Sequence, residues 1–590
     1  MNAILLTGAR PLTQAGFAAA LLLHGAALAQ GPTIVSTSPV RNAIHVPAGA
    51  GVGLTFSQAV SAGSAANVRV FGDQRRGLRP AAVSGGGTSS LLVQPQQPFA
   101  PGEEISVTVP AAVQGTSGAA ATPYVYRFTA AVSGGSTSFN GTANPHMPGY
   151  YRSMRLADFN QDGNLDLLTA DAQGASLVLS AGDGRGNFGN VSSPVSVTVG
   201  TNPDYVVPAD MNNDGKLDAV VTCSGGANRT IVVRLGNGMG GFSNTQTTSI
   251  IPTATPAIGL AVADVNGDGN LDVLTTNGAA LPTTVATRTV SVRLGDGAGN
   301  LTGTTDLPIG PNNCALAVGD VNNDGKMDLV LADLVLNTLQ ARLGDGSGDF
   351  APAGTPVAVG GRPVSLVLTD FNSDGLLDVA TANGADNTVS VSLGNGTGSF
   401  AAATTLPLVG RTPVKLVAAD VDGDGDMDLL VANNGSTGTG PTVNDGVNVL
   451  VNSGTGSFTA APAVGIDRGP IEMAVGDVNN DGALDFVTSN TYNFSMSIRF
   501  NLRVLATRAA RPELAVAVYP NPARDEFRLD VPAAAGAVSV QLLNGLGQVV
   551  RSYAPAPGNR PLTLAGLPAG LYAVRVSSPA GVATRQLVVR

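Results

Sequence analysis

The chain has 590 residues, which is long for one compact domain and predicts about two to four of them. It contains 76 Gly and 37 Pro but only 13% charged residues, a composition typical of short strands joined by tight turns rather than of helices. The formal net charge of −10 excludes the basic surface that a nucleic-acid-binding protein needs.

Residues 1–29 have the pattern of a secretory signal peptide. Arg10 precedes an apolar run that includes Ala18–Leu23, and Ala27-Leu28-Ala29 is a small-x-small cleavage site. The run is short for a membrane span and no later run reaches about 20 apolar residues, so we expect no transmembrane segment. The mature protein is therefore predicted to be exported.

Residues 30–132 read as a separate all-β domain. Alternating apolar and polar residues at Val52–Phe56, Ile105–Val109 and Tyr124–Phe128 predict strands with one buried face. A second module of this kind covers residues 506–590, with strands expected at Phe527–Val531, Val538–Leu543 and Leu571–Val576. We expect both modules to be small β-sandwiches.

Residues 133–505 between them contain seven copies of the pattern Asp-x-Asn/Asp-x-Asp-Gly-x-x-Asp, at spacings of 52, 54, 56, 50, 50 and 57 residues. In each copy an apolar run precedes the pattern, a second follows it, and a third leads into a glycine-rich hairpin before a fourth. Each run is only about five residues long, which favours strands over buried helices. Four short strands per repeat predict a blade, and seven repeats predict a seven-bladed β-propeller in an all-β chain.

The ends of the repeat array predict how the ring closes. The seventh repeat stops after its third strand, Met496–Phe500, with no fourth strand behind it. Gly135–Phe139, at the other end of the array, resembles the hairpin that begins every fourth strand. We therefore expect residues near Phe139 to complete the last blade, which removes an exposed sheet edge.

The seven repeated loops are candidate calcium sites. Calcium takes six to eight oxygen ligands, and alternate residues of each loop supply carboxylate, amide and backbone carbonyl oxygens, with a glycine permitting the sharp bend. The candidate ligands, at loop positions 1, 3, 5, 7 (backbone carbonyl) and 9, are Asp158, Asn160, Asp162, Asn164 and Asp166; Asp210, Asn212, Asp214, Lys216 and Asp218; Asp264, Asn266, Asp268, Asn270 and Asp272; Asp320, Asn322, Asp324, Lys326 and Asp328; Asp370, Asn372, Asp374, Leu376 and Asp378; Asp420, Asp422, Asp424, Asp426 and Asp428; and Asp477, Asn479, Asp481, Ala483 and Asp485.

The donor set favours up to seven Ca²⁺ ions over other metals. Zinc prefers His and Cys, which are absent from the loops, and magnesium demands a stricter octahedron. Asp422 replaces the usual Asn in the sixth loop and gives it a fourth carboxylate, so we expect this site to be the tightest. A structural role for calcium, tying the first strand of each blade to the second, is favoured over a regulatory switch.

Three resemblances follow from these residues. The repeats from about Ser136 to Asn501 resemble the FG-GAP/VCBS repeats of integrin α-subunit propellers and bacterial surface proteins, a likeness that implies calcium at the base of each blade and a role in adhesion or recognition. Tyr519–Pro522, Gly566–Tyr572 and Gln586–Val589 resemble the type A sorting domain of the type IX secretion system. That likeness implies the type IX machinery as a partner and the outer cell surface as the location. Ser38-Pro39, Leu54–Phe56 and Tyr126–Phe128 are similar to bacterial Ig-like domains of the SbsA type.

Little in the sequence favours an enzyme. Outside residues 1–29 the histidines are His45 and His146, and neither a Gly-x-Ser-x-Gly nor a His-Glu-x-x-His motif is present. Glu472 is the one glutamate of the propeller, and most of its aspartates belong to the loops. We expect no catalytic activity. Cys223 and Cys314 lie in non-adjacent repeats and are expected to be buried thiols.

A binding role for an extracellular protein or polysaccharide is the favoured function. We expect the ligand on the face opposite the calcium loops, where long insertions occur at Asn277–Thr289 and Asn433–Gly446. Arg362, Arg411 and Arg468 recur where blades connect and either form a ring for an anionic ligand or are ordinary solvated arginines. An accessory or catalytic part in polysaccharide degradation and a structural surface scaffold remain alternatives. The chain is expected to be a monomer.

Overall fold

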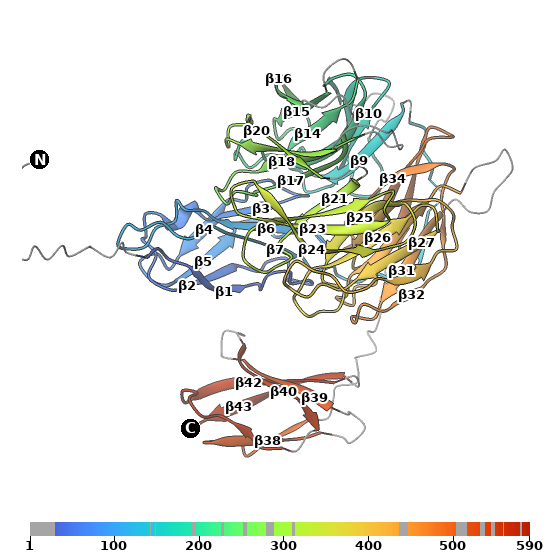
Figure 1. Ribbon diagram of the computed structural model, residues 1–590. Helices are drawn as coiled ribbons and strands as arrows, with labels where there is room; N and C mark the ends of the chain where they lie inside the picture. Colours follow the sequence, from blue (N-terminus) through green and yellow to red (C-terminus); the bar gives the residue numbers. More distant parts are fainter. Residues whose placement is uncertain are drawn as a thin grey trace, which may run out of the picture.

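In the computed structural model, the regular secondary structure of the described part of the chain consists of strands and one turn of 3₁₀ helix (Figure 1). The structure describes residues 30–590 apart from 142, 148, 190–194, 226–228, 252–256, 279–287, 310–312, 436–445, 503–515, 532–536, 544–548, 558–559 and 579–580. The predicted signal peptide, most of both predicted insertions and the predicted boundary at 505/506 fall outside the described residues. Within the described part, no helix has the length and apolar character to cross a membrane.

The N-terminal domain is a sandwich of two antiparallel sheets. One sheet has the order β1 (Ile34–Ser38), β2 (Val52–Phe56), β5 (Ser90–Pro95) and β4 (Ala81–Ser84), and the other has the order β3 (Arg69–Gly72), β6 (Glu104–Val109) and β7 (Tyr124–Thr129). One turn of 3₁₀ helix, Ala65–Asn67, precedes β3. Alternate residues of the strands, such as Leu54, Ile105 and Val107, form the buried core between the sheets, as the alternation predicts.

Seven four-stranded antiparallel units form the blades. They are β9 (Tyr151–Ala157), β10 (Asp166–Asp171), β11 (Ser176–Ser180) and β12 (Val195–Thr198); β13 (Pro203–Ala209), β14 (Asp218–Cys223), β15 (Arg229–Gly236) and β16 (Phe242–Ile251); β17 (Ala257–Ala263), β18 (Asp272–Asn277), β19 (Thr289–Gly295) and β20 (Leu301–Pro308); β21 (Asn313–Gly319), β22 (Asp328–Asp333), β23 (Thr338–Gly344) and β24 (Phe350–Ala358); β25 (Pro363–Thr369), β26 (Asp378–Asn383), β27 (Thr388–Ser392) and β28 (Thr404–Pro407); β29 (Pro413–Ala419), β30 (Asp428–Asn433) and β31 (Gly446–Asn452), with β32 (Phe458–Ala460) and β33 (Val464–Gly465) sharing the fourth position; and β34 (Pro470–Gly476), β35 (Asp485–Asn490) and β36 (Ser495–Asn501) with β8 (Phe139–Asn140).

The first strands of the blades contact one another in a closed cycle, because β9 packs beside β13 and β34 packs back against β9. The second strand of each blade is buried along its whole length in blades two to seven, for example β26. Between neighbouring blades lie separate apolar clusters, so each blade is sandwiched between two others. The prediction of an all-β, seven-bladed propeller flanked by two small sandwiches is confirmed.

The closing strand comes from the N-terminal side of the array. Phe139 pairs with Asn501 and Asn140 with Phe500, so β8 occupies the place of the missing fourth strand. The Phe139 ring packs on Phe486 with centroids 5.0 Å apart. The predicted clasp near Phe139 is confirmed.

The C-terminal domain is a second sandwich. One sheet has the order β37 (Ala517–Tyr519), β38 (Glu526–Asp530) and β41 (Leu562–Thr563); the other has the order β40 (Val549–Pro557), β39 (Ala537–Leu543), β42 (Gly570–Ser578) and β43 (Gly581–Val589). Phe527, Leu542 and Val574 form part of the core between them.

Candidate metal-binding loops and the surface that covers them

Each candidate loop joins the first strand of a blade to the second, and its ninth residue is the first residue of that second strand. This aspartate is buried in every blade and its carboxylate bridges three segments of backbone. In the fifth blade the Asp378 Oδ2 accepts a hydrogen bond from the N–H of Phe371 at 2.9 Å, and Oδ1 accepts one from Gly394 at 2.7 Å. The same two bonds recur in all seven blades. The glycine hairpin after the third strand therefore lies at the same end of the blade as the loop.

The first aspartate of each loop accepts hydrogen bonds from backbone N–H groups later in the same loop, which holds the loop in a tight turn. In the fourth loop the Asp320 Oδ1 accepts the N–H of Asp324 at 3.0 Å, and Oδ2 accepts the N–H of Gly325 at 2.8 Å. The bond from the glycine at position 6 to Oδ2 is present in all seven loops. Gly325 has φ +83°, a conformation that a residue with a Cβ rarely adopts, so this position requires glycine.

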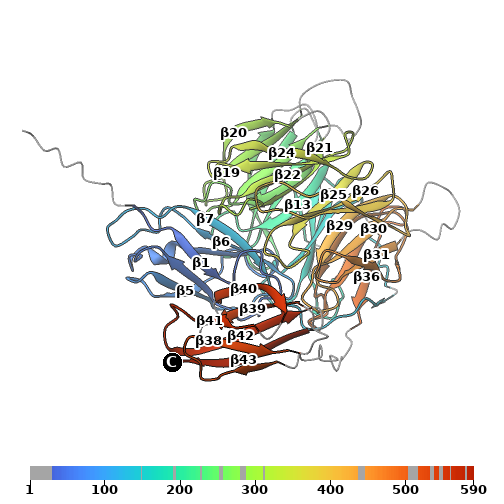
Figure 2. The same cartoon turned by 60° about the horizontal axis from the view of Figure 1, so that its bottom comes forward.

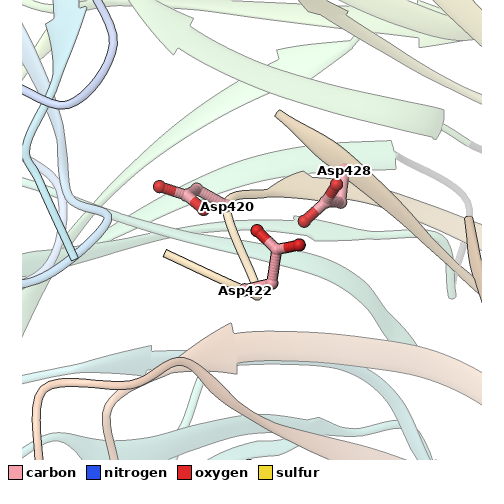
Figure 3. A group of neighbouring side chains, drawn as sticks. All are labelled: Asp420, Asp422 and Asp428. Atoms are coloured by element: carbon pink, nitrogen blue, oxygen red, sulfur yellow. The ribbon is translucent and has the colours of Figure 1, made fainter. Parts of the chain in front are cut away.

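The sixth loop gathers its acidic side chains most closely. Asp420, Asp422 and Asp428 each offer one oxygen, and these oxygens lie within 4.8 Å of one another. Figure 3 shows the Asp422 carboxylate lying between those of Asp420 and Asp428. Oxygen-only donors at this spacing fit a hard divalent cation, whose charge would offset the repulsion between the carboxylates.

Burial raises the pKa values of the carboxyls at positions 1 and 9. The pKa of Asp428 is raised to about 8 and that of Asp420 to about 7, chiefly because both groups are desolvated. Desolvation likewise raises the pKa of Asp218, Asp272 and Asp485 to about 8. Ionising these groups is unfavourable unless a positive charge lies beside them.

The N-terminal domain covers the end of the propeller that carries the loops. Figures 1 and 2 show its β3-β6-β7 sheet on the side that faces the blades. Every one of the seven loops lies against this domain or the segment that follows it. The contacts are Gln74 with Asp158, Leu78 with Asp210, Pro123 with Gly267, Val125 with Gly325, Asn42 with Gly375, His45 with Asp420, and Ser133 with Gly482. Nothing in the repeat pattern predicts this arrangement, because the contacting residues come from unrelated loops of another domain.

The predicted blade connections are at the opposite end of the blades. Arg362 and Arg411 are exposed, whereas Arg468 is half-buried and its guanidinium lies 5.7 Å from the centre of the Tyr492 ring. Arg362 does not occupy the same position as the other two, since Arg362 (φ +58°) and Thr412 (φ +53°) are the equivalent residues before the proline that begins the next blade. The three arginines are therefore not a regular ring.

These connections are held by a buried polar contact that sequence reasoning missed. In blade five the Asn383 Nδ2 donates to the Ser390 Oγ at 2.9 Å, and that hydroxyl accepts the N–H of Gly360 at 3.0 Å. Asn433 and Asn448 make the same contact in blade six at 2.8 Å. The signal in the sequence is an Asn that ends the second strand, together with a Ser or Asn as the third residue of the third strand.

The other residues named from the sequence, Glu472, His146 and Cys223, take part in ion pairs, strand pairing or packing within the propeller. Glu472 lies on an inner strand, 2.8 Å from the Lys415 ammonium and 3.6 Å from the Arg155 guanidinium. Lys415 and Arg155 line a central cavity of about 460 Å³, to which the N-terminal domain contributes Asp73 and Gln74. His146 pairs with Ser495 through a β-bridge, and Cys223 is a buried free thiol.

Comparisons with known proteins agree with the three modules. Residues 158–221, 210–275 and 370–431 match the FG-GAP-like repeat, residues 29–130 match the bacterial Ig-like domain, and residues 517–590 match the secretion system C-terminal sorting domain. Mouse cartilage acidic protein 1 is 30% identical over 149 residues, which are 24% of this chain and 22% of that protein. The chain thus matches about a fifth of the length of this curated relative.

Among solved structures, BBS1N in its complex with ARL6DN has a TM-score of 0.43 and 14% identity, covering 62% of this chain and 98% of that one. A functionally unknown protein from Desulfotomaculum acetoxidans has a TM-score of 0.39 and 13% identity, covering 67% and 98%. The sorting domain marks the chain for type IX secretion and the outer cell surface. The chain is thus a secreted β-propeller protein that contains FG-GAP-like repeats, preceded by a match to the bacterial Ig-like domain and followed by a match to the secretion system C-terminal sorting domain.

Proposed function

We propose that this protein is a calcium-stabilised recognition module of the cell surface that binds an extracellular protein. The observation that carries the proposal is the position of the Ig-like domain, which covers the loop end of the propeller and leaves the opposite rim for a ligand. We define this rim as the turns between second and third strands and the connections between blades.

The rim bears exposed apolar side chains from blade four to blade seven. Leu336 is 63% exposed, Val409 74%, Tyr492 54% and Phe494 41%. Exposed aromatic and aliphatic residues accompanied by arginine are typical of protein interfaces. Trp is absent and the Tyr492 ring already contacts Arg468, which favours a protein ligand with acidic and apolar groups over a polysaccharide that needs free stacking surfaces.

Calcium in the seven loops is the second part of the proposal. Two observations support it: the backbone bonds of the first and ninth aspartates recur in all seven loops, and the sixth loop brings three carboxylates together. Calorimetric titration of the full chain with CaCl₂ should show several binding events, and the same titration with MgCl₂ should show much weaker heat. A chain that gives no heat with calcium would remove this part of the proposal.

The ligand is tested with the full chain immobilised in calcium and exposed to surface proteins of the producing cells and their surroundings. The variant L336S/Y492S/F494S should lose the partner that the unmodified chain retains. The control is M239S, which removes an exposed side chain (79%) from a hairpin at the loop end of blade two. Binding to a glycan array without a protein partner would favour the polysaccharide alternative, and binding to neither would favour the scaffold alternative.

A further inference from the structure

The Ig-like domain contacts the candidate calcium loops through one repeated atom. The carbonyl of the glycine at loop position 6 accepts a hydrogen bond from the domain or its following segment in four blades. Val125 N–H donates to Gly325 at 2.8 Å, Ser133 N–H to Gly482 at 3.0 Å, and Asn42 Nδ2 to Gly375 at 3.0 Å. The Arg75 guanidinium reaches Gly163 at 3.3 Å.

A second set of contacts falls on the side-chain carboxylate of the first aspartate in loops two, four and six. Leu78 N–H donates to the Asp210 Oδ2 at 2.8 Å, and the Arg41 guanidinium lies 3.5 Å from the Asp320 Oδ2. The His45 Nδ1 lies 3.6 Å from the Asp420 Oδ2. In each of these three loops Oδ2 also accepts the N–H of the position-6 glycine, so the domain and the loop backbone meet at the same oxygen.

The approach is close enough to depend on glycine. A Cβ on Gly77 would lie 1.9 Å from the Asp210 Cβ, and a Cβ on Gly325 would lie 2.2 Å from the Tyr124 ring. Gly77 belongs to the Ig-like domain and Gly325 to the fourth loop. Each side of the interface therefore has a glycine at a point where a side chain would clash with the other side. Such contacts require the loop backbone to hold one conformation.

We propose that the Ig-like domain is an intramolecular partner of the metal loops, so that calcium binding and docking of the domain favour each other. The inference rests on the calcium sites of the proposed function. The position-6 glycine lies in the chain between the candidate ligands at positions 5 and 7. An ion bound by those two ligands would therefore fix the direction of the position-6 carbonyl. Partners that bind one conformation of the same loops stabilise each other reciprocally.

Hydrogen exchange of the full chain tests one direction of this coupling. The amides of Leu78 and Val125 donate to loop oxygens, whereas those of Ile105 and Val107 lie in the central strand of the same sheet. Chelation of calcium should speed exchange at Leu78 and Val125 by about tenfold or more and leave Ile105 and Val107 unchanged, since only the docking contacts open.

A wedge variant tests the reverse direction and leaves every candidate metal ligand in place. Gly77→Val places a side chain against Asp210, itself a candidate ligand of the second loop, so the coupling is read from the other six loops, whose calcium affinity should fall by about fivefold or more. The matched control is Gly63→Val in the same domain, where an added Cβ meets no atom within 4 Å. The control should bind calcium as the unmodified chain does.

The outcomes separate the two proposals. Absence of calcium heat in calorimetry would overturn both the calcium sites and the coupling. Calcium heat together with unchanged exchange at Leu78 and Val125, and an unchanged affinity in Gly77→Val, would overturn the coupling and leave the calcium sites standing.

Discussion

The Asn501 side chain accepts a hydrogen bond from the Ser136 N–H at 2.8 Å, although 365 residues separate the two in sequence. The Asn501 Nδ2 also donates to the carbonyl of Val421 at 2.7 Å, and its N–H donates to Asp485 at 2.8 Å. One residue thus joins the segment that leads into the clasp strand, the loop of its own blade and the loop of the neighbouring blade.

Replacing Asn501 should loosen ring closure. We expect Asn501→Ala to lower the free energy of unfolding by about 1–3 kcal/mol, because it leaves the N–H of Ser136 and the carbonyl of Val421 without partners. Asn452 holds the equivalent place in blade six, where its Nδ2 donates to Phe371 at 2.8 Å but no clasp strand is attached. Exchange at Phe139 and Asn140 should rise in Asn501→Ala and not in Asn452→Ala.

The charge of the sixth loop should set its calcium affinity. Asp422→Asn gives this loop the donor set of the others, and we expect its affinity for calcium to fall about tenfold, or about 1.4 kcal/mol. The reciprocal variant Asn372→Asp gives the fifth loop a fourth carboxylate and should raise its affinity. Competition with a chelating dye measures the calcium affinities of both variants. Identical calcium affinities in the two variants would contradict the prediction.

The effect of calcium on stability should depend on pH. Asp218, Asp272, Asp428 and Asp485 have a pKa of about 8 in the folded chain against the ordinary value of 3.8, so without calcium the folded state binds more protons than the unfolded state between these values. Stability in chelator should therefore fall as pH rises through this window. Calcium requires the ionised carboxylates, so its stabilising effect should be larger at about pH 8 than at about pH 5. Melting temperatures in chelator and in CaCl₂ at both pH values test the prediction.

The buried charges of the central cavity should depend on one another. Lys415→Met leaves Glu472, whose side chain is only 4% exposed, with Arg155 as its remaining cation at 3.6 Å. We expect a loss of about 1–3 kcal/mol in chemical denaturation. The double variant K415M/E472Q should lose less than the sum of the two single variants, because each single variant already removes the same Lys415–Glu472 contact. Strict additivity would indicate that the two residues do not act as a pair.

The sequence predicts the repeated parts of the structure well and the unrepeated parts poorly. The seven loops, the strands on either side of them and the clasp at Phe139 follow from a pattern that recurs every 50 to 57 residues, so each copy supports the others. The covering of the loops by Arg41, Leu78 and Val125 has no such support, since it depends on which surfaces of two domains meet. The Asn383–Ser390 contact was missed because Asn and Ser at strand ends are common turn residues.

The pairing of β8 with β36 also determines how the molecule would bear tension. The chain enters the last blade from the Ig-like domain at Phe139 and leaves it towards the sorting domain at Asn501, and these two residues are partners in the same sheet. A protein held at the cell surface through its sorting domain and pulled through its Ig-like domain would load this short pairing and the interface with the loops first. The other six blades lie outside that path, so force could open the clasp while most of the propeller stays folded.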